Sequence, residues 1–372
     1  MSAIRLLPLL LLVFSGCHKG LTWTPDSKGL VLCKSDGTVV AVDIGKDKVQ
    51  KIASLEKEIC WPAVTADGKE IVIPMSVVRS GKNVTVEFHF FDFSGKRLRK
   101  TKPILLADNM PNFEGDLDLD LKGLEDLDNS PAPYEPFKIR VFVSPDGKRL
   151  IATSLLSHST VFFDLKNNTS VLIRNSEPML IGNTPFRPDN KGCLLFKSVH
   201  MNRHKARTES IFVTWDGKSR SLGDVTHFVD QFRNLNESLY EAPFTGWDGK
   251  TAFVETSDGR WSFDTDKLKT SFKASSAKAK AKYISRQHQF KGSKAMLKVR
   301  KTPSKSESGL AELLYYATDD AEPKTILKTE NLLEFYPSPD GRKVAVRFDQ
   351  PSTERVIVIN ELGEPIWNRA FK

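Results

Sequence analysis

The feature that most constrains this 372-residue sequence is a short apolar–turn–apolar unit that recurs along the chain. Its clearest copy runs from Val141 to Ala152, where apolar residues lead into Ser-Pro-Asp-Gly-Lys and a second apolar run follows. Proline presets φ for the first turn position, and glycine supplies the positive φ that a tight reversal needs. Each copy is therefore predicted to be a β-hairpin of about a dozen residues.

Seven such turns follow one another, at residues 23–28, 64–69, 144–148, 187–191, 246–250, 290–294 and 338–342. Each precedes an apolar triplet, and after each hairpin a third strand ends in Asp or Asn, at Asp43, Asp92, Asp164, Asp216, Asp264, Asp319 and Asn360. A short fourth strand usually comes next. Units of about 50 residues are in the range of propeller repeats. The sequence thus predicts an all-β fold, a seven-bladed β-propeller of four-stranded antiparallel blades, and its regularity argues against a large sandwich or two small barrels.

The turns resemble those of the TolB-like (WD40-like) family of β-propeller repeats, whose hallmark is a Trp-Ser-Pro-Asp-Gly-Lys turn before an apolar strand. The turns at 144–148 and 338–342 match this pattern well, and the sixth, at 290–294, matches poorly. The resemblance covers nearly all of residues 21–372. It implies a fold and a habit of binding other proteins, and it implies no reaction, because propellers host many unrelated functions.

The first 17 residues have the layout of a secretory signal, with Arg5 followed by an apolar run at 6–14 and small residues before Cys17. The apolar run is too short for a membrane span, which needs about 20 residues. Cys17 after Ser-Gly resembles the bacterial lipobox, in which that cysteine is lipidated and becomes the mature N-terminus. Phe14 departs from the leucine usual in the family.

We therefore expect a lipoprotein signal peptide at 1–16, a lipidated Cys17 with a short linker at 17–20, and the propeller at 21–372. Ordinary secretion is the alternative. His18 follows the cysteine in place of the aspartate that the family associates with inner-membrane retention, which favours the outer membrane over the inner one.

Three cysteines remain, Cys33, Cys60 and Cys193, an odd number without CxxC spacing. Neither a zinc site nor a disulfide framework is indicated. Cys33 and Cys60 fall in predicted neighbouring inner strands, so a disulfide between them is one reading; small buried thiols are the favoured one.

All long insertions are predicted to lie on one face of the propeller. In a blade with strands A to D running outward, the A–B and C–D turns share one face, and the B–C and D–A connections share the other. The insertions at 74–84, 198–209 and 301–310 are B–C connections, and those at 108–136, 223–241 and 274–287 are D–A connections. Long loops on a rigid scaffold usually carry function, so this face is the predicted binding face.

Two of these segments carry opposite charge. Residues 108–136 hold nine acids and one base, and Asp116, Asp118 and Asp120 suggest a calcium loop. Leucines occupy the positions that need glycine and glutamate, so a solvated or partner-binding acidic loop is favoured. The basic segment at 267–305 supplies candidate contacts to an anionic surface, with a solvated charged face as the plainer reading: Lys278, Lys280, Lys282 and Arg286.

Catalytic motifs are absent from the sequence, which has no GxSxG, HExxH or Walker loop. His200 and His204 have the spacing of a helical metal pair, but the basic residues around them disfavour a metal. We therefore predict no catalytic residue, metal or cofactor. Candidate polar residues for the channel mouth, expected at the starts of inner strands, are Arg140, Glu241, His288 and Glu334.

These observations predict a monomeric, lipid-anchored β-propeller of the periplasm or cell surface that binds or scaffolds an envelope protein through its long-loop face. Its membrane contacts are the lipid and anionic headgroups. The net charge of +9 weakly favours anionic partners, and the secreted address disfavours nucleic acid. The alternative is a propeller enzyme, a hydrolase or lyase with its site at the channel mouth. Clustered Arg, His and Glu in a deep polar pocket would favour the enzyme, and a wide, shallow, charged face the binder.

Overall fold

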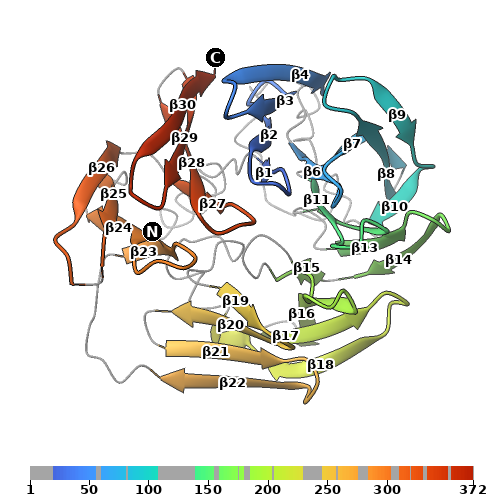
Figure 1. Ribbon diagram of the computed structural model, residues 1–372. Coiled ribbons are helices and arrows are strands. Elements are labelled where there is room, and N and C mark those ends of the chain that lie inside the picture. Colours follow the sequence, from blue (N-terminus) through green and yellow to red (C-terminus); the bar gives the residue numbers. More distant parts are fainter. Residues whose placement is uncertain are drawn as a thin grey trace, which may run out of the picture.

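The chain folds into seven antiparallel sheets arranged in a ring, which confirms the seven-bladed β-propeller (Figure 1). The computed structural model describes residues 20–55, 60–80, 83–107, 139–154, 159–174, 176–179, 185–202, 205–228, 245–256, 259–274, 284–302, 310–318, 320–329, 333–350 and 353–371. Within these residues no helix is long and apolar enough to cross a membrane. A single helical turn lies at 226–228.

Blade 1 has four strands, whereas blades 2 and 3 have five each and so depart from the predicted plan. Blade 1 consists of β1 (Leu21–Trp23), β2 (Gly29–Cys33), β3 (Thr38–Asp43) and β4 (Lys48–Ser54). Blade 2 consists of β6 (Ala63–Val64), β7 (Ile71–Ser80), β8 (Asn83–Phe91), β9 (Arg97–Lys100) and β10 (Ile104–Ala107). Blade 3 consists of β5 (Cys60–Trp61), β11 (Ile139–Val143), β12 (Arg149–Ser154), β13 (Ser159–Asp164) and β14 (Thr169–Ile173).

The other four blades have four strands each in the order of the chain. Blade 4 consists of β15 (Ser176–Pro178), β16 (Gly192–Asn202), β17 (Lys205–Thr214) and β18 (Ser219–Asp224). Blade 5 consists of β19 (Thr245–Asp248), β20 (Thr251–Thr256), β21 (Gly259–Asp264) and β22 (Lys269–Ala274). Blade 6 consists of β23 (Ile284–Gln289), β24 (Met296–Thr302), β25 (Leu310–Tyr316) and β26 (Lys324–Thr329), and blade 7 of β27 (Glu334–Pro337), β28 (Lys343–Gln350), β29 (Thr353–Asn360) and β30 (Pro365–Phe371).

The A–B turns form because their side chains bind their own backbone. In blade 2 the Thr65 hydroxyl donates to the Asp67 carboxylate at 2.7 Å, and the same carboxylate accepts the Lys69 amide at 3.1 Å. Asp residues in turns commonly accept such local bonds. The turn then needs a positive φ, which Gly147 supplies in blade 3 at 69°, as predicted, and Ser27 in blade 1 at 58°.

The core lies between blades, because each sheet buries both of its faces. All five residues of β2 are buried, as the consecutive apolar triplets predicted. Six apolar clusters each join two neighbouring blades; the cluster between blades 2 and 3, for example, packs Phe88 and Phe90 against Leu150 and Val161.

The ring closes between blade 7 and blade 1 without exchange of a strand, since blade 1 consists of β1 to β4 alone and blade 7 of β27 to β30 alone. Side chains join the two blades, which lie side by side at the top of Figure 1. The Trp23 indole donates to the Tyr336 carbonyl at 2.6 Å, the Trp367 indole donates to Asp47 at 2.8 Å, and the Ser27 hydroxyl accepts the Asp340 amide at 3.1 Å.

Two predicted insertions are strands. Residues 74–84 belong to the β7–β8 hairpin and residues 198–209 to the β16–β17 hairpin, each with only two residues outside the strands at its tip. The pattern Asn83-Val-Thr-Val-Glu-Phe alternates apolar and polar residues and already signalled this, because β8 buries Val84, Val86 and Phe88. Likewise, 284–287 belong to β23 and not to a loop.

The entry into blade 2 also departs from the predicted plan. β5 pairs in parallel with β11 of blade 3, whereas β6, two residues later, pairs with β7 of blade 2. After blade 1, the chain therefore pairs with the inner edge of blade 3 before it enters blade 2. This crossing places Trp61 beside Arg140, whose guanidinium lies over the indole ring.

Candidate functional site

The face that carries the B–C and D–A connections, here called the hairpin face, is elaborated by two long hairpins. The B and C strands of blade 2 have 10 and 9 residues and those of blade 4 have 11 and 10, whereas β2 and β12 have 5 and 6. The added length lies at the ends of the B strands, so both hairpins extend on this face. Val78 near the tip of the first hairpin is 55% exposed.

Several predicted site residues lie outside the described part of the chain. These are Cys17, the acidic segment 108–136, Glu241, His204, and Lys278, Lys280 and Lys282. Arg286 lies in β23, opposite Val299. His200 lies in β16, opposite Ala206, and therefore in a strand and not in a helix or a loop.

The basic segment 267–305 does not lie on one face. Lys267 lies in the C–D turn of blade 5 and Lys291 in the A–B turn of blade 6, and both turns belong to the opposite face, here called the turn face. Part of its charge is also neutralised, because Arg300 forms an ion pair with Glu312, which Lys328 contacts at 2.8 Å. The positive charge available on the hairpin face is thus smaller than the sequence count suggested.

Two of the predicted channel-mouth residues meet in a buried group. Arg140 from β11 and Glu334 from β27 are 1% and 6% exposed. The Tyr336 hydroxyl donates to Glu334 at 2.8 Å. Burial, followed by the charge of Glu334, raises the pKa of Tyr336, while Arg347 and Arg140 act in the opposite sense. We call Arg140, Glu334, Tyr336, Arg347 and Glu354 the axial cluster.

The axial cluster ties blade 7 to blade 1. Arg347 pairs with Glu354, both almost fully buried, and donates to the carbonyls of Gly20 at 3.3 Å and Cys33 at 2.9 Å. Gly20 is required here, since a Cβ would lie 1.4 Å from the Trp61 ring. The sequence did not single out Arg347 or Glu354, because their pairing depends on how blade 7 folds.

His288 was a candidate for the channel mouth because it was expected at the start of an inner strand, and its place in the strand differs from that expectation. It is the fifth of the six residues of β23, so it lies near the turn face and not at the start of the strand. Its ring packs edge-on against Phe290 at 5.3 Å, and burial lowers the pKa of the imidazole. Of the described candidates, Arg140 and Glu334 thus belong to the axial cluster, whereas His288 lies at the other end of its strand.

Cys33, Cys60 and Cys193 are buried thiols. The Cys60 side chain hydrogen-bonds the Cys33 thiol and lowers its pKa, and burial raises the pKa of Cys193. In the part of the chain that the structure describes, no three His, Cys, Asp or Glu side chains gather to hold a metal.

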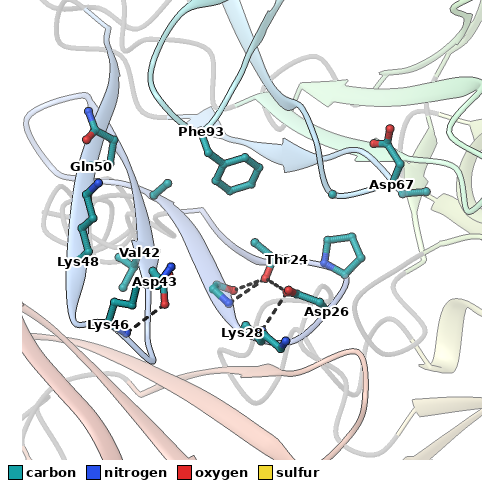
Figure 2. A pocket seen from close by; sticks show the side chains of 15 residues that line it. Thr24, Asp26, Lys28, Val42, Asp43, Lys46, Lys48, Gln50, Asp67 and Phe93 are labelled. Carbon is teal, nitrogen blue, oxygen red and sulfur yellow. Dashed lines mark hydrogen bonds and ion pairs between the residues drawn. The ribbon is translucent and has the colours of Figure 1, made fainter.

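A pocket of about 510 Å³ opens on the turn face between blades 1 and 2 (Figure 2). Sequence reasoning missed it, because the turn face was predicted to carry only tight turns. Ala41, Val42 and Phe93 supply apolar surface. Lys46, Lys48 and Gln50 follow one side of the pocket in Figure 2, and Asp67 lies on the opposite side.

Comparison with known proteins adds little to this description. No family model and no curated protein matches the sequence. Three solved structures to which the chain is similar are dihydro-heme d1 dehydrogenase (12% identity, TM-score 0.46, 96% of this chain and 66% of that chain), the β-propeller domain of the Trilobed protease from Pyrococcus furiosus (11%, 0.45, 91% and 92%), and a putative 6-phosphogluconolactonase from Bacteroides uniformis (13%, 0.45, 94% and 98%). At TM-scores below 0.5 these likenesses carry no argument about activity. The seven sheets themselves establish that the chain is a seven-bladed β-propeller.

Proposed function

We propose that this propeller is a binding module of the bacterial cell envelope, held at a membrane by a lipid on Cys17, and that it engages a protein partner through its hairpin face. The observation that carries the proposal is the extension of the β7–β8 and β16–β17 hairpins on one face of an otherwise compact ring. Loops and hairpins on a rigid scaffold are common sites of recognition. The TolB-like pattern of the turns supports the same class of function.

The anchor supports a partner at the membrane surface. β1 starts on the hairpin face at Leu21, and Cys17 precedes it by four residues, a leash of at most about 14 Å. A lipid on that leash holds the hairpin face close to the bilayer. Lys278, Lys280, Lys282 and Arg286 then contact anionic headgroups, each adding about 1 kcal/mol within a Debye length. We place the protein in the outer membrane in preference to the inner one, on the strength of His18.

The alternative, an enzyme at the channel mouth, has less support. Arg140 and Glu334 are buried, and Arg347 and Glu354 are bound to one another and to the backbone of blade 1. Such a cluster favours a role in closing the ring. A catalytic group needs access to substrate.

Site-specific photocrosslinking in cells tests the binding proposal. A photoreactive residue at Val78, which is 55% exposed on the hairpin face, is compared with one at Leu362, which is 63% exposed in the C–D turn of blade 7 on the turn face. We expect a protein adduct from Val78 only, and its loss in Cys17→Ala, which also fails to incorporate labelled fatty acid. Adducts of equal yield from both positions, or none from Val78, contradict the proposed binding face, and label on Cys17→Ala contradicts the anchor.

A further inference from the structure

We propose that the pocket between blades 1 and 2 is a binding site for a small aromatic anion, a flat ring that carries one carboxylate or sulfonate. The site lies on the turn face, opposite the proposed protein-binding face, so it stands independently of the proposed function. Its volume of about 510 Å³ falls within the range of small-molecule pockets, about 300–1,000 Å³.

The pocket lies in a seam whose counterparts between blades 3 and 4 and between blades 6 and 7 hold an aromatic ring. The C–D turns 92–96, 214–218 and 360–364 have the same two backbone hydrogen bonds, from the first residue to the fifth and from the fourth to the first. Phe93, Trp215 and Glu361 therefore occupy equivalent second positions in blades 2, 4 and 7.

In blades 4 and 7 an aromatic ring lies at this position or contacts it, in the seam to the preceding blade: Trp215 itself in blade 4, and Tyr315 of blade 6 against Glu361 in blade 7. Trp215 packs against Phe162 at 5.8 Å and Phe186 at 5.6 Å, and its indole donates to the Asn190 carbonyl at 2.7 Å. In blade 7 the hydroxyl of Tyr315 donates to the Glu361 carbonyl at 3.0 Å. At the seam between blades 1 and 2, Phe93 packs against the apolar core and also borders the open pocket.

The acidic groups of the pocket are already neutralised or bound. Asp43 pairs with Lys46 at 3.3 Å, and Asp67 pairs with Lys69 at 3.9 Å. Neither Lys28 nor Lys48 forms an ion pair with any residue that the structure describes. Lys28 interacts with the charge of Asp26 and helps to lower its pKa, so Lys48 is the less compensated of the two lysines in the pocket wall. A ligand anion gains most by lying at Lys48.

The carboxylates exclude a second negative charge from the inner end of the pocket. Asp26 accepts the Thr24 hydroxyl at 2.7 Å and the Lys28 amide at 3.1 Å, and the Thr24 bond is the main reason that its pKa is lowered. The group stays ionised at neutral pH. The apolar body of the ligand packs against Phe93 and Pro25, since aromatic rings gain from stacking as well as from burial.

Two fluorescent probes with one skeleton test the proposal. The anion is 1-anilinonaphthalene-8-sulfonate, and N-phenyl-1-naphthylamine is the same skeleton without the sulfonate. We expect the propeller lacking residues 1–17 to bind the anion at one site and more tightly than the neutral probe, with the difference shrinking at high salt. Failure to bind either probe, or equal binding of both at low salt, overturns the proposal.

Two variants locate the site. Phe93→Trp copies the filled seam of blade 4, so we expect it to abolish binding of both probes while the melting temperature stays at or above that of the wild type. We expect Lys48→Met to weaken binding of the anionic probe by about two- to fivefold and to leave the affinity for the neutral probe unchanged. Lys166→Met, an exposed lysine in the C–D turn of blade 3, is the matched control and changes neither.

The outcomes separate the pocket from general surface binding. If Phe93→Trp binds the anionic probe as tightly as the wild type does, the probe binds elsewhere and the proposal is overturned. The proposal is also overturned if Lys48→Met and Lys166→Met lose the same amount of affinity for the anionic probe. If Phe93→Trp fails to fold, the contrast between the two lysine variants decides alone.

Discussion

At the scale of single residues, the turn chemistry was predictable and the contacts between turns were not. The Pro-Asp-Gly pattern at residues 145–147 predicted a positive φ at its glycine, and Gly147 has a φ of 69°. Ser27 takes the same conformation, and its hydroxyl also accepts the Asp340 amide across the seam between blades 7 and 1. That second role depends on a residue more than 300 positions away, which no local pattern encodes.

Replacing Gly147 with valine should destabilise the protein through backbone strain alone. The nearest atom to a new Cβ is Ala66 Cβ at 3.9 Å, so the site has room, but φ is 69°. A β-branched residue in this region costs about 1–3 kcal/mol. Urea unfolding of Gly147→Val should show a lower midpoint with an unchanged slope, and a curve that matches the wild type would speak against the turn register.

The turn aspartates should make stability depend on acid pH. The Thr65 hydroxyl, and then the Lys69 amide, lower the pKa of Asp67 below its unfolded value of about 3.9. A carboxylate with a lowered folded pKa stabilises the native state above the unfolded pKa, and this contribution is lost as the pH falls through the folded pKa.

Melting temperatures between pH 6 and pH 3 check this expectation. The wild type should lose more stability over that interval than Asp67→Asn, which keeps a local acceptor but does not titrate. Identical pH profiles for the two proteins would contradict the assignment.

At the scale of elements, repeated blade units were predictable because each carries its own turn and its own apolar strands. The residues that lengthen the β7–β8 and β16–β17 hairpins were predicted to form loops, although the alternation of apolar and polar residues at 83–88 indicated a strand. β5 was beyond prediction, since two residues that pair in parallel with β11 leave no periodic pattern. The pocket was missed for a related reason: it depends on which side chain fills a seam between two blades.

At the scale of the whole molecule, the ring depends on side chains to join its ends. Arg347 and Glu354 are 2% and 4% exposed, and Arg347 donates to the carbonyls of Gly20, just before β1, and of Cys33, the last residue of β2. Removing one partner of a buried ion pair leaves an uncompensated charge and typically costs about 3–5 kcal/mol.

We therefore expect Arg347→Met to be among the most destabilising single changes, by about 3–5 kcal/mol in urea unfolding. The double variant Arg347→Met/Glu354→Gln, which removes the stranded charge, should recover part of the loss. A single variant within about 1 kcal/mol of the wild type would contradict the role of the pair in closure.

The most direct test of the account asks whether binding depends on the extended hairpins. Residues 199–207 are replaced by Asn-Gly, a turn that joins Ser198 to Thr208 in the existing register of β16 and β17. Leu362→Asp on the turn face is the control, and the melting temperatures of both variants are measured first. We predict that the yield of the Val78 photoadduct falls about tenfold in the shortened protein, the loss expected for about 1.4 kcal/mol of binding, and stays unchanged in Leu362→Asp. An unchanged yield from a folded, shortened protein would contradict the proposal that the hairpin face binds the partner.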